Sequence, residues 1–224
     1  MPKKQRVLCI IPIRSGSKTI KNKNVKKFKG KPLSYYNIKT ADVSGIFEKI
    51  IIASDSQKYF KILKKYTNKF KTEFFYRSKK SATNKAQTEI VIKEVLKKFK
   101  NFDYIFLIQV TTPYLKAIDL KKAFTKFKRY NYESMFSSYV SKKFFWKKIK
   151  HTHKPFNYNL KKRPMHQNIN EIYVENGAFY IFRKNSFLKN MNRLSGKIGT
   201  YTMKERDSIE IDSVEDFKNA EARD

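Results

Sequence analysis

The stretch VLCIIPIRSGSKTIKNKN (Val7–Asn24) decides the fold. Its apolar beginning, Val7–Ile11, is typical of a short strand that is buried on both faces. The strand opens directly into a basic turn of small residues, Arg14–Lys18. In open α/β sheets the ligand lies where strands end, so the loops that follow strands are the places where chemistry is expected.

Apolar runs and stretches of helical period alternate along the chain after this opening. The predicted strands are Val7–Ile11, Lys49–Ser54, Thr72–Tyr76, Tyr104–Gln109 and Ser134–Val140, and the predicted helices between them are Leu33–Ser44, Gln57–Thr67, Gln87–Phe99 and Asp119–Tyr130. Strand–helix alternation favours an open, mostly parallel α/β sheet.

The pattern changes at about residue 140. Residues 141–171 are aromatic and basic without a clean period, which predicts an extended excursion from the sheet. The alternation then resumes with a strand at Ile172–Phe182, a short helix at Lys184–Asn190, a strand at Ile198–Met203 and a closing helix at Ser213–Arg223. We expect a single domain over residues 1–224, because two full domains would be cramped in this length.

Composition narrows the class of protein. Hydrophobic residues make up 40% of the 224 residues, which is too apolar for a disordered chain. No run reaches the roughly 18 to 20 apolar residues of a membrane span, so a cytoplasmic protein is expected. The single cysteine, Cys9, lies within an apolar run and is predicted to be buried and inert.

The net charge of +32 attracts anions such as nucleotides and sugar acids. The lysines are spread over nearly every segment, which is more typical of a compositional habit than of one binding surface. A nucleic-acid-binding protein is a remote alternative, supported by this charge and by Phe144–Trp146, whose rings could stack on bases or be buried against a partner subunit.

The loop after the first strand has the chemistry of a phosphate site. It matches neither GxGxxG nor GxxxxGK[ST]. However, the backbone of the turn Ser15-Gly16-Ser17-Lys18 can approach a phosphate, and Arg14 places a guanidinium at its start. Lys23 and Asn24 can return to the same anion. A solvated basic loop is the competing interpretation, because lysine and arginine occupy 51 of 224 positions.

The acidic residues are scarce and clustered. Only 19 are present, yet six lie within twelve consecutive residues: Glu205, Asp207, Glu210, Asp212, Glu215 and Asp216. Glu210 and Asp212 are two residues apart on a strand-like segment, so both project to one face. Two hard oxygen ligands beside a phosphate loop suit Mg²⁺ held jointly with a nucleotide. Helix capping is the alternative, and it suits Glu215 and Asp216 better.

Two further groups of polar residues give weaker signals. Gln109-Val110-Thr111-Thr112-Pro113 follows the fourth predicted strand and can either contact a base or sugar or form a plain structural turn. No third ligand is spaced to make a zinc site with the histidine pair at 151 and 153. All three histidines, His151, His153 and His166, are therefore expected to be exposed to solvent.

Seven motifs occur in one order along the chain: IPIRSGSKTIKNKN, SDSQ, YRSKKSATNKAQT, LIQVTTP, RPMHQ, YVENGAFYIF and SIEIDSVEDF. In this order the sequence resembles the acylneuraminate cytidylyltransferases, which activate sialic acid and related nonulosonic acids. The resemblance runs from about residue 7 to residue 221.

The resemblance implies a Rossmann-like, three-layer nucleotidyltransferase fold and transfer of CMP from CTP to the anomeric hydroxyl of an acidic nine-carbon sugar, with release of pyrophosphate. It also implies Mg²⁺ as cofactor and a homodimer in which the excursion reaches the partner's active site. Transfer to 3-deoxy-manno-octulosonate, or another sugar nucleotidyltransferase activity, is the alternative within this fold.

The residues carried over fall into three groups. The nucleotide would contact Arg14, Ser15, Gly16, Ser17, Lys18, Lys23, Asn24, Arg77 and Thr88; the sugar would contact Gln109, Thr111, Arg163, Gln167, Asn176 and Gly177; and Glu210 and Asp212 would bind the metal. Arg14, Lys23 and Asp212 are the expected catalytic residues. The chain departs from the family at Glu210, where an aspartate is usual, and within RPMHQ, where relatives carry more arginine.

Overall fold

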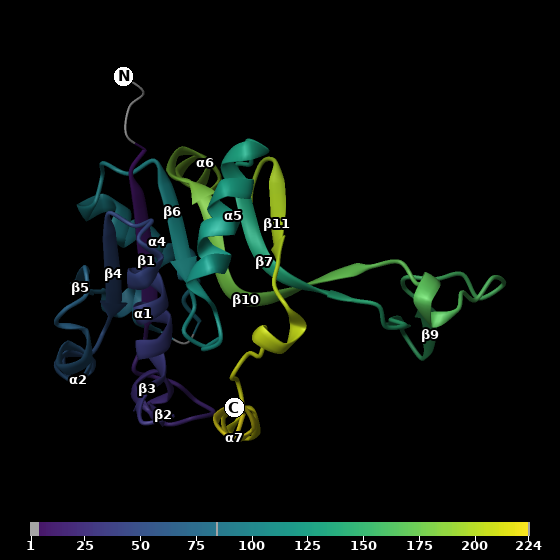
Figure 1. Cartoon of the computed structure of the whole chain (residues 1–224), viewed down its shortest axis with the longest axis horizontal. Coiled ribbons are helices and arrows are strands. Elements are labelled where there is room, and N and C mark those ends of the chain that lie inside the picture. The colour runs from purple at the N-terminus through teal and green to yellow at the C-terminus, as the bar shows by residue number, and fades with distance from the viewer. Residues whose placement is uncertain (1–4, 84, 224) are drawn as a thin grey trace.

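The computed structural model describes residues 5–83 and 85–223. Its centre is a seven-stranded sheet with the strand order β11-β7-β10-β6-β1-β4-β5 (Figure 1). The strands are β1 (Val7–Ile13), β4 (Lys49–Ser54), β5 (Thr72–Tyr76), β6 (Tyr104–Ile108), β7 (Ser134–Ser141), β10 (Ile172–Arg183) and β11 (Ile198–Thr202). Neighbouring strands are parallel except that β10 runs antiparallel to both β6 and β7, which confirms the mostly parallel sheet.

Helices cover both faces of this sheet. They are α1 (Leu33–Ser44), α2 (Gln57–Thr67), α3 (Lys79–Ala82), α4 (Thr88–Lys98), α5 (Ala117–Arg129), α6 (Lys184–Asn190) and α7 (Val214–Glu221). Alternate residues of β1 point to opposite faces. Cys9 and Ile11 pack in the apolar layer under α1, α2 and α5, whereas Leu8 and Ile10 pack in the layer under α4 and α6. The result is the predicted three-layer α/β fold, with Cys9 fully buried as expected.

The strand order reverses beside β1. After β1 the chain adds β4 and β5 on one side, and it then returns to place β6 on the other side. Parallel strands that diverge in this way leave a crevice at their carboxyl ends, where ligands bind in open α/β sheets. The loops that begin at Arg14 and Gln109 follow β1 and β6, so both open into this crevice.

The C-terminal segment packs against the loop that follows β1. Ile211 is fully buried in a small apolar cluster with Ile20, Phe28 and Phe217. Its backbone N–H donates to the Thr111 carbonyl at 2.8 Å. The strand character predicted for residues 208–212 is not confirmed, since this segment lies outside the strands of the sheet.

Two short hairpins complete the described fold. β2 (Lys27–Phe28) pairs with β3 (Lys31–Pro32) ahead of α1, and β8 (Trp146–Ile149) pairs with β9 (Thr152–Pro155) within the predicted excursion. Single 3₁₀ turns occur at Lys23–Val25, His166–Asn168 and Glu205–Asp207. None of these elements is predictable from the sequence, because each is shorter than the window in which a period is recognised.

Residues 141–171, which we call the arm, extend away from the sheet between β7 and β10 (Figure 1). Large apolar side chains on the arm are exposed, among them Trp146 at 48%, Phe156 at 66% and Met165 at 68%. The three histidines all lie on the arm and are exposed, as predicted. In the described part of the chain, the helices are too short or too polar to span a membrane.

Candidate active site

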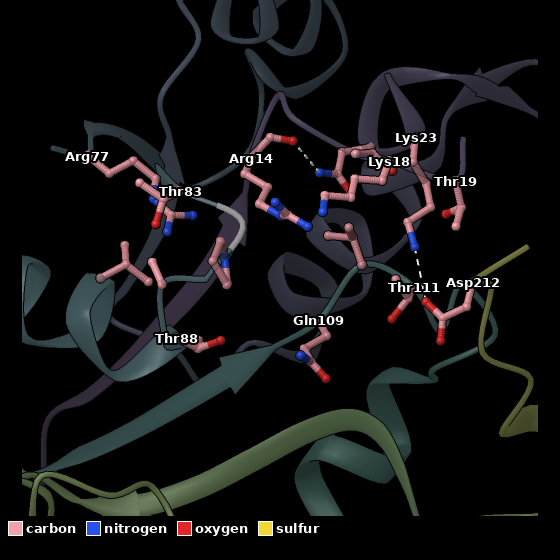
Figure 2. Close-up of a pocket in the computed structure, with 16 residues that line it drawn as sticks. Arg14, Lys18, Thr19, Lys23, Arg77, Thr83, Thr88, Gln109, Thr111 and Asp212 are labelled. Carbon is pink, nitrogen blue, oxygen red and sulfur yellow. Dashed lines mark hydrogen bonds and ion pairs between the residues drawn. The ribbon is translucent and has the colours of Figure 1, made fainter. Parts of the chain in front are cut away.

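A pocket of about 430 Å³ opens at the carboxyl ends of β1 and β6 (Figure 2). Loops from four parts of the chain line it: the loop after β1, the segment between β5 and α4, the loop after β6, and the segment before α7. The lining residues are Pro12, Arg14, Ser17, Lys18, Thr19, Lys23, Asn24, Arg77, Thr83, Ala86, Thr88, Val91, Gln109, Val110, Thr111 and Asp212. The pocket therefore lies at the topological switch point of the sheet.

Hydrogen bonds fix the shape of the loop after β1. The buried Asn24 amide donates to the Arg14 carbonyl at 2.9 Å, which joins the two ends of the loop. Asp55, directly after β4, accepts from the backbone N–H of Ser15 at 2.9 Å and from its hydroxyl at 2.7 Å. Asp55 belongs to the SDSQ motif, but its role as the anchor of the neighbouring loop could not be seen before β1 and β4 were known to pair.

Lys23 joins the loop after β1 to the C-terminal acidic segment. Its ammonium group donates to the Ile211 carbonyl at 2.8 Å and lies 3.1 Å from a carboxylate oxygen of Asp212 (Figure 2). The Lys23 side chain is 12% exposed, whereas that of Asp212 is 69% exposed. The basic loop and the acidic pair, about 190 residues apart in sequence, thus meet at one wall of the pocket.

Gly177 brings Gln109 and Glu210 close to each other. It has a φ of +63°, in the left-handed region that favours glycine. A β-carbon at this position would lie 2.9 Å from Oε1 of Gln109 and 3.1 Å from Oε1 of Glu210, which is closer than ordinary contact. Glycine therefore allows an amide at the end of β6 and one of the two predicted metal ligands to pack against the same turn.

The two carboxylates differ in their surroundings. Glu210 is accessible to solvent, but partial burial of its carboxylate raises its pKa, and the nearby charge of Asp212 raises it further. The Thr111 hydroxyl lies 3.4 Å from Oε1 of Glu210 and opposes this shift. Burial is the larger of the two causes, and a cation bound beside Glu210 and Asp212 would favour the ionised carboxylate against both.

The donor set is compatible with a metal ion that is shared with a ligand. Glu210 and Asp212 supply hard oxygen atoms of the kind that Mg²⁺ prefers, and residues 5–83 and 85–223 contain no group of three or more acidic, histidine or cysteine side chains that could hold an ion alone. Mg²⁺ is usually bound by one or two carboxylates together with substrate phosphates, so two protein carboxylates suffice.

Arg77 lies at the opposite side of the pocket from Asp212 (Figure 2). It is 5% exposed, and its guanidinium donates to the hydroxyl of Ser81 at 3.3 Å and to the carbonyl of the same residue. Burial lowers the pKa of Arg77, and the positive charge of Arg14 contributes to the lowering, whereas Asp55 and Glu94 oppose it. A cation held inside the protein in this way is suited to bind an anion or a polar ring.

Most of the residues predicted from sequence lie together. Arg14, Ser17, Lys18, Lys23, Asn24, Arg77, Thr88, Gln109, Thr111 and Asp212 line the pocket. Ser15 and Gly16 are in the same loop, and Gly177 and Glu210 contact Gln109 or Thr111. Thr83 and Ala86 were not expected in the site, because small residues in a loop carry no signal of their own.

Three predicted sugar-binding residues lie elsewhere. The Asn176 amide makes four hydrogen bonds inside the protein, with Ser137, Met203, Ser208 and the backbone of Ala178. These bonds hold the turn that carries Gly177.

Arg163 and Gln167 are on the exposed arm, outside the lining of the pocket in their own chain. The Arg163 guanidinium stacks over the ring of Phe144, 4.1 Å from its centroid, and donates to the hydroxyl of Tyr158 at 3.2 Å. Arg163 is therefore held in place on the arm and not in the pocket.

A three-layer sheet with a pocket at its switch point is typical of α/β proteins that bind nucleotides, and we assign the chain to this class. More narrowly, the chain belongs to the cytidylyltransferase family, because the family profile described as Cytidylyltransferase matches residues 8–222. The family predicted from the motif order is thereby confirmed.

Curated relatives and solved structures agree with this assignment. The chain is 26% identical to a pseudaminic acid cytidylyltransferase from Campylobacter jejuni subsp. jejuni serotype O:2, over 95% of this chain and 94% of that protein. It is 29% identical to an N-acylneuraminate cytidylyltransferase from Escherichia coli O18:K1:H7, over 96% of this chain and 51% of that protein. The chain thus spans about half the length of the N-acylneuraminate relative.

Two solved structures share the fold. A CMP:2-keto-3-deoxy-manno-octonic acid synthetase complexed with CTP superimposes with a TM-score of 0.71 at 13% identity, over 97% of this chain and 98% of that one. A 4-diphosphocytidyl-2C-methyl-D-erythritol synthase from Anaerococcus prevotii superimposes with a TM-score of 0.69 at 14% identity, over 97% of this chain and 95% of that one.

Proposed function

We propose that this enzyme transfers CMP from CTP to the anomeric hydroxyl of a nonulosonic acid and releases pyrophosphate. The observation that carries the proposal is the meeting of Lys23 and Asp212 at 3.1 Å, which places the basic loop and the acidic pair at one pocket. The class of acceptor is supported by two relatives, which are named for pseudaminic acid and for N-acylneuraminate.

The nucleotide would lie across the pocket between its two cationic sides. Arg14, Lys18 and Lys23 would hold the triphosphate, with the turn Ser15–Lys18 against the phosphate oxygens. Arg77, from the segment before α4, and Thr88, at the start of α4, would contact the base and ribose. Charge placed in advance by the fold stabilises the departing pyrophosphate, so Arg14 and Lys23 would act mainly in the transition state.

Glu210 and Asp212 would hold Mg²⁺ beside the triphosphate. When bound, the ion supplies Lewis-acid neutralisation of phosphate oxygens. The partner of Lys23 would then change. Its ammonium group contacts Asp212 in the protein without ligands, and it would be available to the phosphates once the Asp212 carboxylate binds a cation.

The acceptor would bind beside Gln109 and Thr111, near the turn of Gly177. Its anomeric hydroxyl would attack the α-phosphorus in line and lose its proton to water, forming one phosphorus–oxygen bond as the bond to the pyrophosphate oxygen breaks. Positioning the two reactants accounts for much of such catalysis, and the proposal includes no covalent enzyme intermediate.

We further propose a homodimer in which the arm of one chain reaches the pocket of the other. Arg163 and Gln167 lie on the arm, outside the pocket lining of their own chain, and exposed Trp146, Phe156 and Met165 are suited to burial against a second copy. Sedimentation analysis tests this proposal. A wild-type monomer at the concentrations at which the enzyme is active would contradict it.

The function is tested by pyrophosphate release. The protein is incubated with CTP, Mg²⁺ and a panel of sialic, legionaminic, pseudaminic and 3-deoxy-manno-octulosonic acids. We expect release with CTP and a nine-carbon acid and little release with ATP, GTP or UTP. Turnover with only the eight-carbon acid would favour the alternative acceptor, and nanomolar, steeply salt-dependent DNA or RNA binding without CTP turnover would favour the nucleic-acid alternative.

The single domain over residues 1–224 and the cytoplasmic location stay predictions.

A further inference from the structure

A single carboxylate outside the pocket holds the segment that carries Arg77. Glu94, on α4, accepts hydrogen bonds from the backbone N–H of Ser78 at 3.2 Å, from the Ser78 hydroxyl, and from the hydroxyl of Ser81 at 2.8 Å. Ser78 and Ser81 begin and end the first turn of α3, since the Ser78 hydroxyl also caps the Ser81 N–H at 3.3 Å. Glu94 thus ties this turn to α4.

The same serine connects Glu94 to Arg77. The hydroxyl oxygen of Ser81 accepts from Nε of Arg77 at 3.3 Å. It lies 2.8 Å from Oε2 of Glu94 and 3.1 Å from the Ser78 carbonyl oxygen, which are the two acceptors open to its single proton. The Ser81 carbonyl accepts a second bond from the guanidinium. Ser81 is fully buried, so these bonds are shielded from competition by water.

Arg77 has no carboxylate in direct contact within the described residues. Its guanidinium is therefore held by Ser81, and the Ser81 hydroxyl in turn contacts Glu94. We propose that Glu94 is a positioning residue for the nucleotide pocket, which sets the Arg77 guanidinium through Ser81. This inference rests on the proposed binding of CTP at Arg77.

The charge state of Glu94 agrees with this role. Burial by itself would raise its pKa, but hydrogen bonds from Ser78 and Ser81 and the charge of Arg77 outweigh burial and lower it. Glu94 therefore stays ionised and accepts from both serines. An uncharged amide could place its oxygen at the position of Oε2, but it would lose the negative charge, and its NH₂ group would stand where Oε1 accepts the Ser78 hydroxyl.

The test measures CTP binding by titration calorimetry without acceptor, and kcat at saturating CTP with acceptor. Glu94→Gln should weaken CTP binding about tenfold, the usual scale of a lost hydrogen bond to a charged group, and leave kcat within about threefold. Glu94→Asp, which keeps the charge on a shorter chain, should recover part of the affinity. Glu73→Gln is the control, since Glu73 pairs with Lys49 on β4 and β5.

A double-mutant cycle separates positioning from general support of the fold. In an Arg77→Ala background, Glu94→Gln should change the CTP dissociation constant by less than about twofold, because the group through which it acts is gone. A full tenfold loss in that background, or no loss in the wild-type background, would overturn the proposal.

Amide hydrogen exchange distinguishes failure of this inference from failure of the proposed function. Glu94→Gln should accelerate exchange at Ser78 and Ser81 in the protein without nucleotide, since both N–H groups belong to the Glu94 network. If the wild-type protein does not bind CTP, the proposed function is wrong and the exchange result decides whether Glu94 holds the segment. Unchanged exchange would overturn the positioning role whatever the nucleotide.

Discussion

Substitution of Gly177 by alanine should separate the stability of the fold from the integrity of the site. The backbone at this position has a φ of +63°, and a left-handed conformation costs a residue with a side chain about 1 to 2 kcal/mol. For a chain of this size that cost corresponds to a fall in Tm of roughly 2 to 8 °C. The protein should therefore still fold at room temperature.

The effect on activity should be larger than this loss of stability suggests. To reach an ordinary contact of 3.4 Å from the new β-carbon, Oε1 of Gln109 must move by about 0.5 Å and Oε1 of Glu210 by about 0.3 Å. A displacement of 1 Å at a reacting centre can cost about a hundredfold in rate, so we expect kcat/KM to fall about tenfold or more.

The matched control is Gly45→Ala. Gly45 ends α1 with a φ of +67°, and a β-carbon added there would meet no atom within 4 Å, so this variant carries the same backbone cost without the contacts. Pyrophosphate release and thermal melting are measured for both variants. Equal kcat/KM in the two variants would refute the reasoning, because backbone strain alone would then explain the result for Gly177→Ala.

Three further predictions concern single side chains. Asp212→Ala should abolish turnover and leave the Tm nearly unchanged, because this side chain is 69% exposed; near wild-type activity would exclude it as a metal ligand. Arg14→Ala should lower kcat/KM for CTP by roughly 30- to 800-fold, about 2 to 4 kcal/mol, and an unchanged value would remove it from the site. The folded protein lowers the pKa of Glu94 below the usual value of 4.5, so ionised Glu94 stabilises the fold at pH values above 4.5. This contribution is lost as the pH falls through the folded-state pKa. Melts of wild type and Glu94→Gln should therefore converge in acid, and a constant difference would contradict the assignment.

The strands and helices of the sheet could be predicted because their signals are local. The ranges of α1, α2, β4 and β5 agree with the sequence prediction residue for residue, since each is bounded by polar residues, proline or glycine. The closing helix also begins as expected, with Ser213 and Asp216 forming a capping box. Elements of two to four residues were missed because so few positions cannot display a period.

The site was predictable only in part. Lysine is so common that Lys18 and Lys23 could be selected only by their place after β1 and by the order of motifs, whereas the scarcity of acidic residues made Glu210 and Asp212 stand out. Asp55 and Glu94 gave no such signal. Each acts on a loop that pairing or packing brings near, and hydrogen bonds to such a loop have no fixed spacing in sequence.

The sequence by itself determined the alternation of strands and helices, the burial of Cys9, and which loops follow strands, because these depend on side-chain periodicity and on local turn chemistry. Only the tertiary structure decided that Lys23 contacts Asp212, that Gly177 lies against Gln109 and Glu210, and that Arg163 is on the arm outside the pocket. The physical reason is that these distances are set by the strand order and by the packing of Ile211 with Ile20 and Phe217. Both bring together residues that are far apart along the chain, and their separation in sequence carries no information about their contact.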